Sequence, residues 1–356
     1  MTINITPDAL TRFGRELFKA SGMDNDKADT SARLLVLGDM MGRQTHGMAL
    51  APLYLDQLER RLMQPTGEPV CVKDTGSTIL WEGNYLPGLW LVDQALQLAF
   101  GRIREHGVVT IVIRRSHHIA CLAALIKQAT DRGYLAILAN SDPSGRFVAP
   151  YGGKEPLMTP NPFAIGYPGT KTPVLVDICA SITTVSMTRK KVAEGRNFEY
   201  PWLLDAAGAP TTDPTVLEGP GPRGSILLLG GTECGHKGFG LALMVEALTQ
   251  GLSGCGRRRP ENRWGGNVFL QVLDPDAFSG RADFIEQMDF LTDSSHENAP
   301  IRQDEPVRMP GEQAERNISK AHINGIALTR HTIDALGIWA RKLAISLPDA
   351  LTTHGR

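Results

Sequence analysis

Residues 89–139 read LWLVDQALQLAFGRIREHGVVTIVIRRSHHIACLAALIKQATDRGYLAILA. This stretch contains an apolar helical pattern at 89–103, a β-branched strand at 108–113, a second helical pattern at 121–131 and a second strand at 135–139. Strands that alternate with helices along the chain are typical of a sheet with helices packed on it. The stretch therefore predicts an α/β fold, which further strands at 174–176 and 268–272 would extend.

Helical patterns dominate the two ends of the chain. Thr6 followed by Pro7 is typical of a helix start, and apolar residues recur at helical spacing from there to Gly22. Three further segments have helical spacing: 28–40, 50–58 and 332–347. We therefore predict a helical unit made of residues 1–75 with 310–356, beside an α/β unit of residues 76–309.

The composition is that of a soluble globular protein with little net charge. The 356 residues include 37 Lys or Arg and 38 Asp or Glu, so the formal net charge is -1. This balance gives no electrostatic reason to expect nucleic acid or an anionic membrane as a partner. No apolar run reaches the ~18 residues of a membrane span, and the N-terminus lacks a signal-peptide pattern. We therefore expect a cytoplasmic protein.

The five cysteines are scattered and form no CxxC pair. An odd number of dispersed cysteines argues against a disulfide framework and against a structural zinc site. This pattern fits a reducing compartment and a protein without a bound metal.

Two histidine segments are candidates for proton chemistry. Residues 42–47, GRQTHG, place His46 beside the hydroxyl of Thr45 and between glycines, which permit close approach by a ligand. The alternative interpretation is that His46 only caps a helix end. His117 and His118 follow a predicted strand, where ligands of open α/β sheets gather, and could supply an acid/base or a cofactor contact. A metal pair is disfavoured because no third-ligand motif such as HExxH is present.

Two further segments could contact phosphate. Residues 140–143, NSDP, follow a predicted strand and could offer backbone N–H groups, although an ordinary turn would look the same. Residues 230–238, GGTECGHKG, resemble a Walker loop only superficially. His236 precedes the lysine and no Ser or Thr follows it, which excludes ATP hydrolysis. Lys237 at the start of an apolar helix still suits a phosphate or pyrophosphate.

No GxGxxG follows a strand with an acidic residue ~20 positions later, so a Rossmann domain is disfavoured. Eight other segments instead carry a family resemblance. They are THG at 45–47, SHH at 116–118, APYGG at 149–153, NPFAIGYP at 161–168, VDICAS at 176–181, GAPTTDP at 208–214, HKGFGLALMVEAL at 236–248 and MPGE at 309–312. In this order, they resemble the malate/L-lactate dehydrogenase family of non-Rossmann type. Its members include ureidoglycolate and sulfolactate dehydrogenases, diketogulonate reductase and Δ1-piperideine-2-carboxylate reductases.

The resemblance implies a non-Rossmann α/β fold with a mixed sheet and flanking helices, and a homodimer. It implies NAD or NADP as cofactor and hydride transfer at C2 of a small 2-hydroxy acid, 2-oxo acid or cyclic 2-imino acid. By the same resemblance, residues 76–309 would bind the cofactor, and the helical unit would serve substrate binding and dimerisation. A cofactor-binding homologue without catalysis, regulatory in role, is the alternative.

The resemblance also assigns residues. His46 matches the proton donor of the imine reductases, His118 matches the proton acceptor of the ureidoglycolate dehydrogenases, and Thr45 keeps the hydroxyl of the usual Ser. We retain both histidines as candidates. The expected cofactor contacts are His118, Ile119, Ala120, Cys121, Leu122, Ser141, Asp177, Ile178, Cys179, Lys237 and Gly238.

The substrate positions depart from the family pattern. Leu50 stands where relatives carry an Arg that grips the substrate carboxylate, a contact that Leu cannot make. Met187 stands where a polar or acidic residue would orient the catalytic group, and TPNP from Thr159 replaces GTNP. We expect Arg43, within one helical turn of His46, to serve as the substitute anion grip. These departures predict an unusual substrate.

Overall fold

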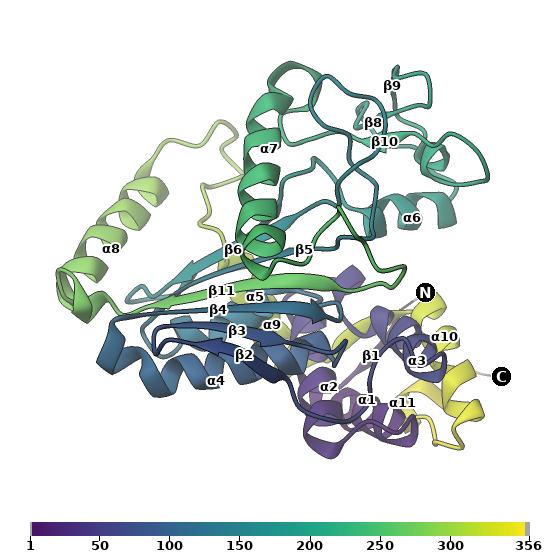
Figure 1. Ribbon diagram of the computed structural model, residues 1–356, viewed down its shortest axis with the longest axis horizontal. Helices are drawn as coiled ribbons and strands as arrows, with labels where there is room; N and C mark the ends of the chain where they lie inside the picture. The colour runs from purple at the N-terminus through teal and green to yellow at the C-terminus, as the bar shows by residue number, and fades with distance from the viewer. Residues whose placement is uncertain (1, 353–356) are drawn as a thin grey trace.

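The computed structural model describes residues 2–352 and is built around a mixed sheet (Figure 1). In this sheet β3 and β4 pair in parallel, and the other neighbouring strands pair antiparallel. The strand order is β2 (Val70–Asp74), β3 (Thr78–Glu82), β4 (Val108–Ser116), β11 (Gly266–Leu273), β5 (Leu135–Ser141), β6 (Pro162–Tyr167) and β7 (Val174–Cys179). The predicted α/β fold with a mixed sheet is thereby confirmed.

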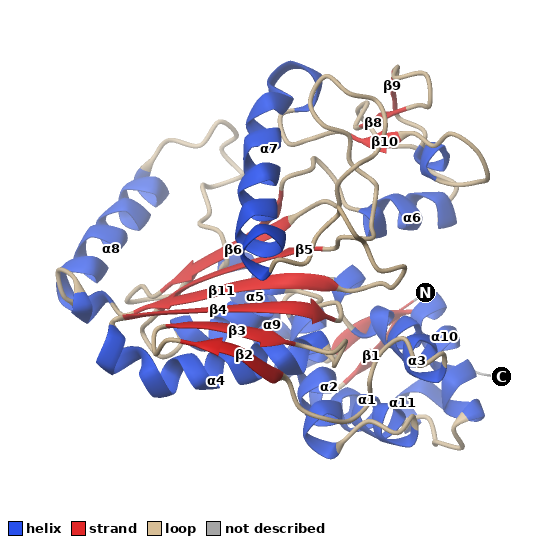
Figure 2. Ribbon diagram, in the orientation of Figure 1, coloured by secondary structure: helices blue, strands red, loops and turns tan. Residues whose placement is uncertain are grey.

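Helices cover both faces of the sheet (Figure 2). Along β4, Ile111 and Ile113 point into the main core with α4 (Gly88–His106) and α5 (Leu122–Thr130). Val112, between them, joins a smaller cluster on the opposite face with Val245 of α7 (Gly231–Glu246). This alternation follows from the two-residue period of a strand. Strand β4 thus contributes to two separate apolar layers.

The two ends of the chain form one helical layer beside the sheet. β1 (Thr2–Ile5) pairs antiparallel with β12 (Ile326–Thr329). The predicted cap at Thr6 is confirmed, because its hydroxyl accepts the N–H of Ala9 at 3.4 Å. The helices of this layer are α1 (Pro7–Ala20), α2 (Asn25–Met40), α3 (Ala51–Glu59), α9 (Glu312–Asn324), α10 (Arg330–Lys342) and α11 (Asp349–Thr352). Its buried residues continue into the core under the sheet.

Residues 142–161 and 180–230, on either side of β6 and β7, build a separate lobe with its own small core, which includes Val148, Leu203 and Ile226. Its elements are α6 (Val185–Ala193), β8 (Leu203–Leu204), β9 (Pro210–Thr211) and β10 (Ser225–Ile226). After the lobe, α7 continues into a π-helical turn, Ala247–Gly251, and α8 (Arg281–Glu297) lies at the outer edge of the molecule (Figure 1).

Two boundaries differ from the sequence prediction. The helix expected to start at Lys237 begins at Gly231, because Gly230 adopts a left-handed conformation and turns the chain into it. The last amphipathic helix ends at Lys342 rather than at residue 347, since Ala344 has a positive φ of 55°. Lys237 therefore lies inside the second turn of α7. Within residues 2–352, no helix is long and apolar enough to cross a membrane.

Candidate active site

His46 and His118 come together from two separate elements. His46 ends the 3-10 turn Gln44–His46, between α2 and α3, and His118 follows β4. Their rings are stacked, with centroids 6.2 Å apart and planes 25° from parallel. The structure thus places both predicted proton-transfer candidates in one site.

A hydroxyl group holds the same nitrogen of each ring. Thr45 Oγ1 lies 3.0 Å from Nδ1 of His46, and the Tyr54 hydroxyl lies 2.8 Å from Nδ1 of His118. No group within residues 2–352 hydrogen-bonds Nε2 of either ring. Both histidines therefore keep Nε2 available for a ligand.

The partners of His118 determine where its proton sits. Its Nδ1 also receives the backbone N–H of Ala120 at 3.3 Å, and an amide N–H can only donate. Burial raises the pKa of Tyr54 well above its usual value, so the tyrosine hydroxyl keeps its proton and can donate it to an Nδ1 that already accepts from Ala120. Nδ1 is therefore an acceptor, and neutral His118 carries its proton on Nε2.

The charges around the two rings differ. Burial, followed by the nearby His46, lowers the pKa of His118 to about 3, so this ring stays neutral. Burial also lowers the pKa of His46, and Arg43 adds to that effect, but the Asp177 carboxylate opposes it. The Thr45 hydroxyl can either donate to or accept from Nδ1. His46 can therefore take up or release a proton at Nε2 without losing its partner.

Three of the predicted cofactor segments lie against one another. At the end of β7, Asp177 Oδ2 accepts the N–H of Ala123 in the first turn of α5 at 3.0 Å, with the Cys121 thiol 3.8 Å away. A methyl group on Gly238 would lie 2.9 Å from the carbonyl oxygen of Ala180, so α7 approaches the chain just after Cys179 very closely. Segments 118–122, 177–180 and 238 therefore pack against one another.

The exposure of these residues is uneven. Ile119, Ala120, Cys121 and Leu122 are buried, whereas Ile178 is 43% exposed. Lys237 is exposed on α7, and no carboxylate within residues 2–352 pairs with it. A free ammonium group can bind a phosphate, and each open Nε2 can bind one polar atom of a ligand.

Ser141 and Thr159 are held in buried polar networks. The Ser141 side chain is 1% exposed, and its hydroxyl lies 2.6 Å from Thr249 Oγ1 and accepts from Gln250 Nε2 at 3.0 Å. Thr159 is 8% exposed, and its hydroxyl donates to Asn161 Oδ1 at 2.8 Å. Both hydroxyls are therefore used within the protein, which leaves the backbone of Ser141 as its possible ligand contact.

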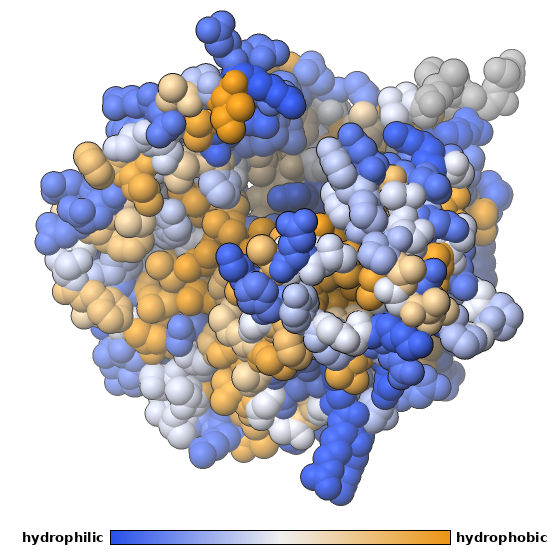
Figure 3. Space-filling model, turned by 90° about the horizontal axis from the view of Figure 1, so that it is seen from above, coloured by the Kyte–Doolittle hydropathy of each residue, from blue (hydrophilic) through white to orange (hydrophobic). Residues whose placement is uncertain are grey.

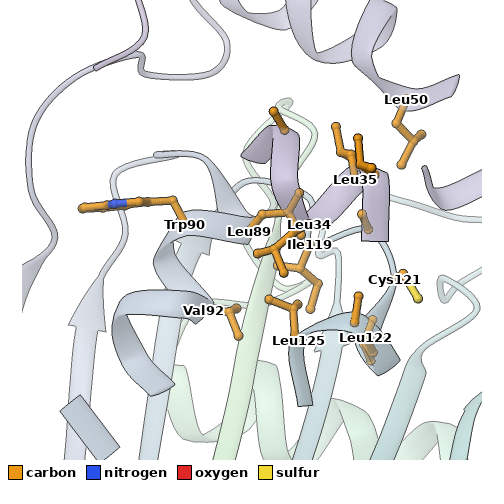
Figure 4. Packing of buried hydrophobic residues seen from close by; sticks show 14 of the residues in the cluster. Leu34, Leu35, Leu50, Leu89, Trp90, Val92, Ile119, Cys121, Leu122 and Leu125 are labelled. Atoms are coloured by element: carbon orange, nitrogen blue, oxygen red, sulfur yellow. The ribbon is translucent and has the colours of Figure 1, made fainter. Parts of the chain in front are cut away.

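The residues at the substrate positions lie in different surroundings. Leu50 is 9% exposed and belongs to the main core with Leu35, Ile119, Cys121 and Leu122 (Figure 4). Met187 lies in the first turn of α6 and is 36% exposed, and its N–H donates to Thr184 Oγ1. Arg43 is exposed beside His46, without an ion pair among the described residues. Arg43 is thus the open cation next to the histidines.

Three residues of the site were missed by the sequence analysis. Trp264 stacks on His118 with ring centroids 4.8 Å apart, Tyr54 binds the same ring, and Asp39 lies under the loop that carries His46. Tyr54 lies in the helical pattern at 50–58, and that pattern indicates only an apolar helix face. An aspartate three positions before Gly42 of the GRQTHG segment is the sequence signal for Asp39, whereas nothing in the sequence around Trp264 indicates its role.

Comparison with known proteins identifies the class. A family model for malate/L-lactate dehydrogenase matches residues 5–337. The L-lactate dehydrogenase of Cupriavidus necator is 30% identical over 328 residues, which cover 90% of this chain and 92% of that protein. The L-sulfolactate dehydrogenase of Methanothermobacter thermautotrophicus is 27% identical over 353 residues, covering 97% of this chain and 98% of that protein.

Solved structures show the same fold. The malate dehydrogenase from Entamoeba histolytica superposes with a TM-score of 0.91 at 22% identity, covering 98% of this chain and 100% of that one. For the Δ1-piperideine-2-carboxylate reductase from Pseudomonas syringae the TM-score is 0.82 at 25% identity, with coverages of 95% and 99%. The family model and the L-lactate dehydrogenase match define a dehydrogenase-class enzyme. The chain belongs to the malate/L-lactate dehydrogenase family, as its motifs predicted.

Proposed function

We propose that this enzyme transfers a hydride between NAD(P)H and C2 of a small 2-oxo acid, 2-hydroxy acid or cyclic 2-imino acid. The observation that carries the proposal is the stacked pair of His46 and His118, each with Nδ1 bound to a hydroxyl and Nε2 open. Such a pair can address one polar atom on a substrate from two sides. The names of the relatives, which act on lactate, malate, sulfolactate or piperideine-2-carboxylate, agree with this chemistry.

The two histidines have different roles in this proposal. His46 exchanges the proton on the oxygen or nitrogen attached to C2, because Thr45 supports it in both protonation states. His118 donates a hydrogen bond through Nε2 and orients the ligand, because its Nδ1 is blocked by two donors. The cofactor supplies or accepts the hydride when bound. Residues 118–122, 177–179 and 237–238 would hold it.

Arg43 is the proposed grip for the substrate carboxylate. Leu50 is packed in the core, so no cation occupies the position that relatives use, whereas Arg43 is exposed beside His46. Arg43→Ala should raise KM about tenfold while kcat changes little, and Arg43→Lys should restore part of the affinity. Arg60→Ala, at another exposed arginine, is the control. An unchanged KM for Arg43→Ala would remove this residue from the site.

The function is tested with NADH and NADPH against a panel of 2-oxo acids and cyclic imines, followed by absorbance. His46→Ala should slow single-turnover hydride transfer by about 100-fold or more, whereas His118→Ala should mainly weaken binding. If neither substitution slows the chemical step, the acid/base assignment is wrong. Tight cofactor binding without turnover on any compound would instead support the alternative, a non-catalytic cofactor-binding homologue, which the core position of Leu50 favours.

A homodimer is part of the proposal. Leu243, Met244 and Leu252 are 51%, 37% and 56% exposed; the first two lie on α7 and the third follows the π-helical turn. Figure 3, which views the molecule from above, shows apolar surface gathered in the middle of that face. Exposed apolar side chains and apolar surface of this kind are typical of subunit contacts. Leu243→Glu should convert a dimer to a monomer in sedimentation, whereas a wild-type monomer would contradict the proposal.

The proposed compartment is the cytoplasm. All five cysteines are free thiols in the structure: Cys71, Cys121, Cys179, Cys234 and Cys255. Free thiols in this number support a reducing environment. Localisation of a fluorescently tagged chain would test this assignment, and export from the cell would contradict it.

A further inference from the structure

Asp39 is a buried carboxylate next to the loop that carries His46. It is the penultimate residue of α2 and is 7% exposed. Its Oδ2 accepts the N–H of Met48 at 2.7 Å. A carboxylate in a buried position needs such a donor, because an unpaired buried charge is strongly destabilising. The hydrogen bond therefore ties the chain two residues after His46 to the end of α2.

Backbone packing reinforces this link. A methyl group on Gly47 would overlap the Asp39 carboxylate. A methyl group on Gly38 would lie 2.9 Å from the carbonyl oxygen of His46. Glycine at both positions lets the end of α2 and the peptide of His46 touch directly. The position of His46 is thus fixed by contact with α2 rather than by its own side chain alone.

Two side-chain hydrogen bonds hold the part of this loop that precedes His46. Gln44 Nε2 donates to the carbonyl oxygen of Ala327 at 3.3 Å, and Asn317 Nδ2 donates to that of Met41 at 3.2 Å. These two hydrogen bonds join the loop to β12 and α9. Asp39 holds the opposite side of His46, and its carboxylate is the more deeply buried anchor.

We propose that Asp39 is a positioning residue, which holds His46 in its stacked place against His118 without touching substrate. This inference rests on the proposed function, in which His46 exchanges the substrate proton. A displacement of about 1 Å at a reacting group can lower a rate on the order of 100-fold. Loss of the Asp39 anchor should therefore lower kcat far more than it changes cofactor binding.

The test compares Asp39→Ala, Asp39→Asn and the control Asp93→Ala. Asparagine keeps an oxygen that can accept the N–H of Met48, whereas alanine does not. Asp93 is another buried aspartate, 7% exposed, which accepts from Arg33 and Gln128 away from the histidines. Replacing Asp93 therefore measures how much the loss of a buried carboxylate lowers kcat when that carboxylate does not contact the loop of His46.

We expect kcat to fall about 10-fold to 100-fold in Asp39→Ala, while its affinity for NADH is retained. Asp39→Asn should restore most of the rate. Asp93→Ala should show no such fall in kcat. Equal losses in Asp39→Ala and Asp93→Ala, or no rescue by asparagine, would overturn the inference. A second readout is the reaction of His46 with diethylpyrocarbonate, measured by peptide mass spectrometry. It should be faster in Asp39→Ala alone, and it reports on Asp39 even if the wild type shows no turnover and the proposed function fails.

Discussion

The Tyr54 hydroxyl lies 2.8 Å from Nδ1 of His118, and the N–H of Ala120 points to the same nitrogen. Tyr54 belongs to α3 in the helical layer, whereas His118 follows a strand of the sheet. The bond between Tyr54 and Nδ1 therefore helps to join the two structural layers and also helps to select the tautomer of a site histidine. This relationship makes α3 part of the active site although its residues face the core.

In Tyr54→Phe, the proton of neutral His118 should no longer be confined to Nε2. Without the hydroxyl, Nδ1 of His118 keeps only the weaker bond from Ala120, so a proton can move from Nε2 to Nδ1. We expect kcat/KM to fall about tenfold and nitrogen-15 spectra to show a mixture of tautomers. Tyr134→Phe, at a buried tyrosine that stacks on Phe100, is the matched control. A single Nε2–H form in Tyr54→Phe would contradict the assignment.

Asp39 should make the stability depend on pH. Burial raises its pKa from 3.8 to about 7, opposed in part by the N–H of Met48. Between these values the folded protein keeps a proton that the unfolded chain has released, so the free energy of unfolding falls as pH rises, by up to about 4 kcal/mol.

The amide side chain in Asp39→Asn cannot ionise, so the free energy of unfolding of this variant should not fall for that reason as pH rises. Its Tm relative to that of the wild type should therefore increase from pH 5 to pH 8, as measured by calorimetry. Asp93→Asn is the control for replacing a buried aspartate by its amide. A Tm difference that is constant over this range would show that Asp39 ionises near its ordinary pKa.

Lys27 should be a strong contributor to stability. Its ammonium group lies 3.9 Å from the centroid of the Trp90 ring, and the residue is 1% exposed. Its carboxylate neighbours are Asp24, Asp26 and Glu68, at 3.0, 3.7 and 3.6 Å. Lys27→Met keeps the apolar stem and should lower the free energy of unfolding by about 2 kcal/mol in urea. Lys171→Met, at an exposed ion pair, should change it by less than about 0.5 kcal/mol.

Trp264 should support the histidine site through its ring face. It stacks on His118 at 27° and meets the edge of His117, each with ring centroids 4.8 Å apart. Trp264→Phe keeps an aromatic face and should retain activity, whereas Trp264→Ala should lower kcat/KM about threefold to tenfold. Trp339→Ala, which removes a partly buried indole in α10, is the control. Equal activities of the two Trp264 variants would exclude a role for the ring.

The sequence was informative where a pattern is local. The period of β4 and the cap at Thr6 could be predicted because neighbouring residues determine them. Strand β2 could not be predicted in this way, because all five of its residues are exposed and no apolar alternation marks it. The boundary of α7 was misjudged because the left-handed conformation of Gly230 is a property of the folded backbone.

The site shows the same division between local and long-range information. THG and SHH identified His46 and His118, but their stacking depends on the packing of α2, α3 and the end of β4. Ser141 appeared suited to a ligand because it follows a strand, yet Thr249 and Gln250, more than 100 positions later, use its hydroxyl. Only long-range contacts distinguish a polar group open to ligand from one that the protein already satisfies.

The bond from Gln44 to Ala327 has a consequence for how the enzyme matures. The two residues are 283 positions apart, so the histidine loop is complete on the ribosome long before its brace exists. At about 10 residues per second, β12 and α9 follow roughly half a minute later. Nascent chains should therefore hold the His46 loop by its Asp39 contact alone, and full catalytic competence should emerge only when β12 has paired with β1.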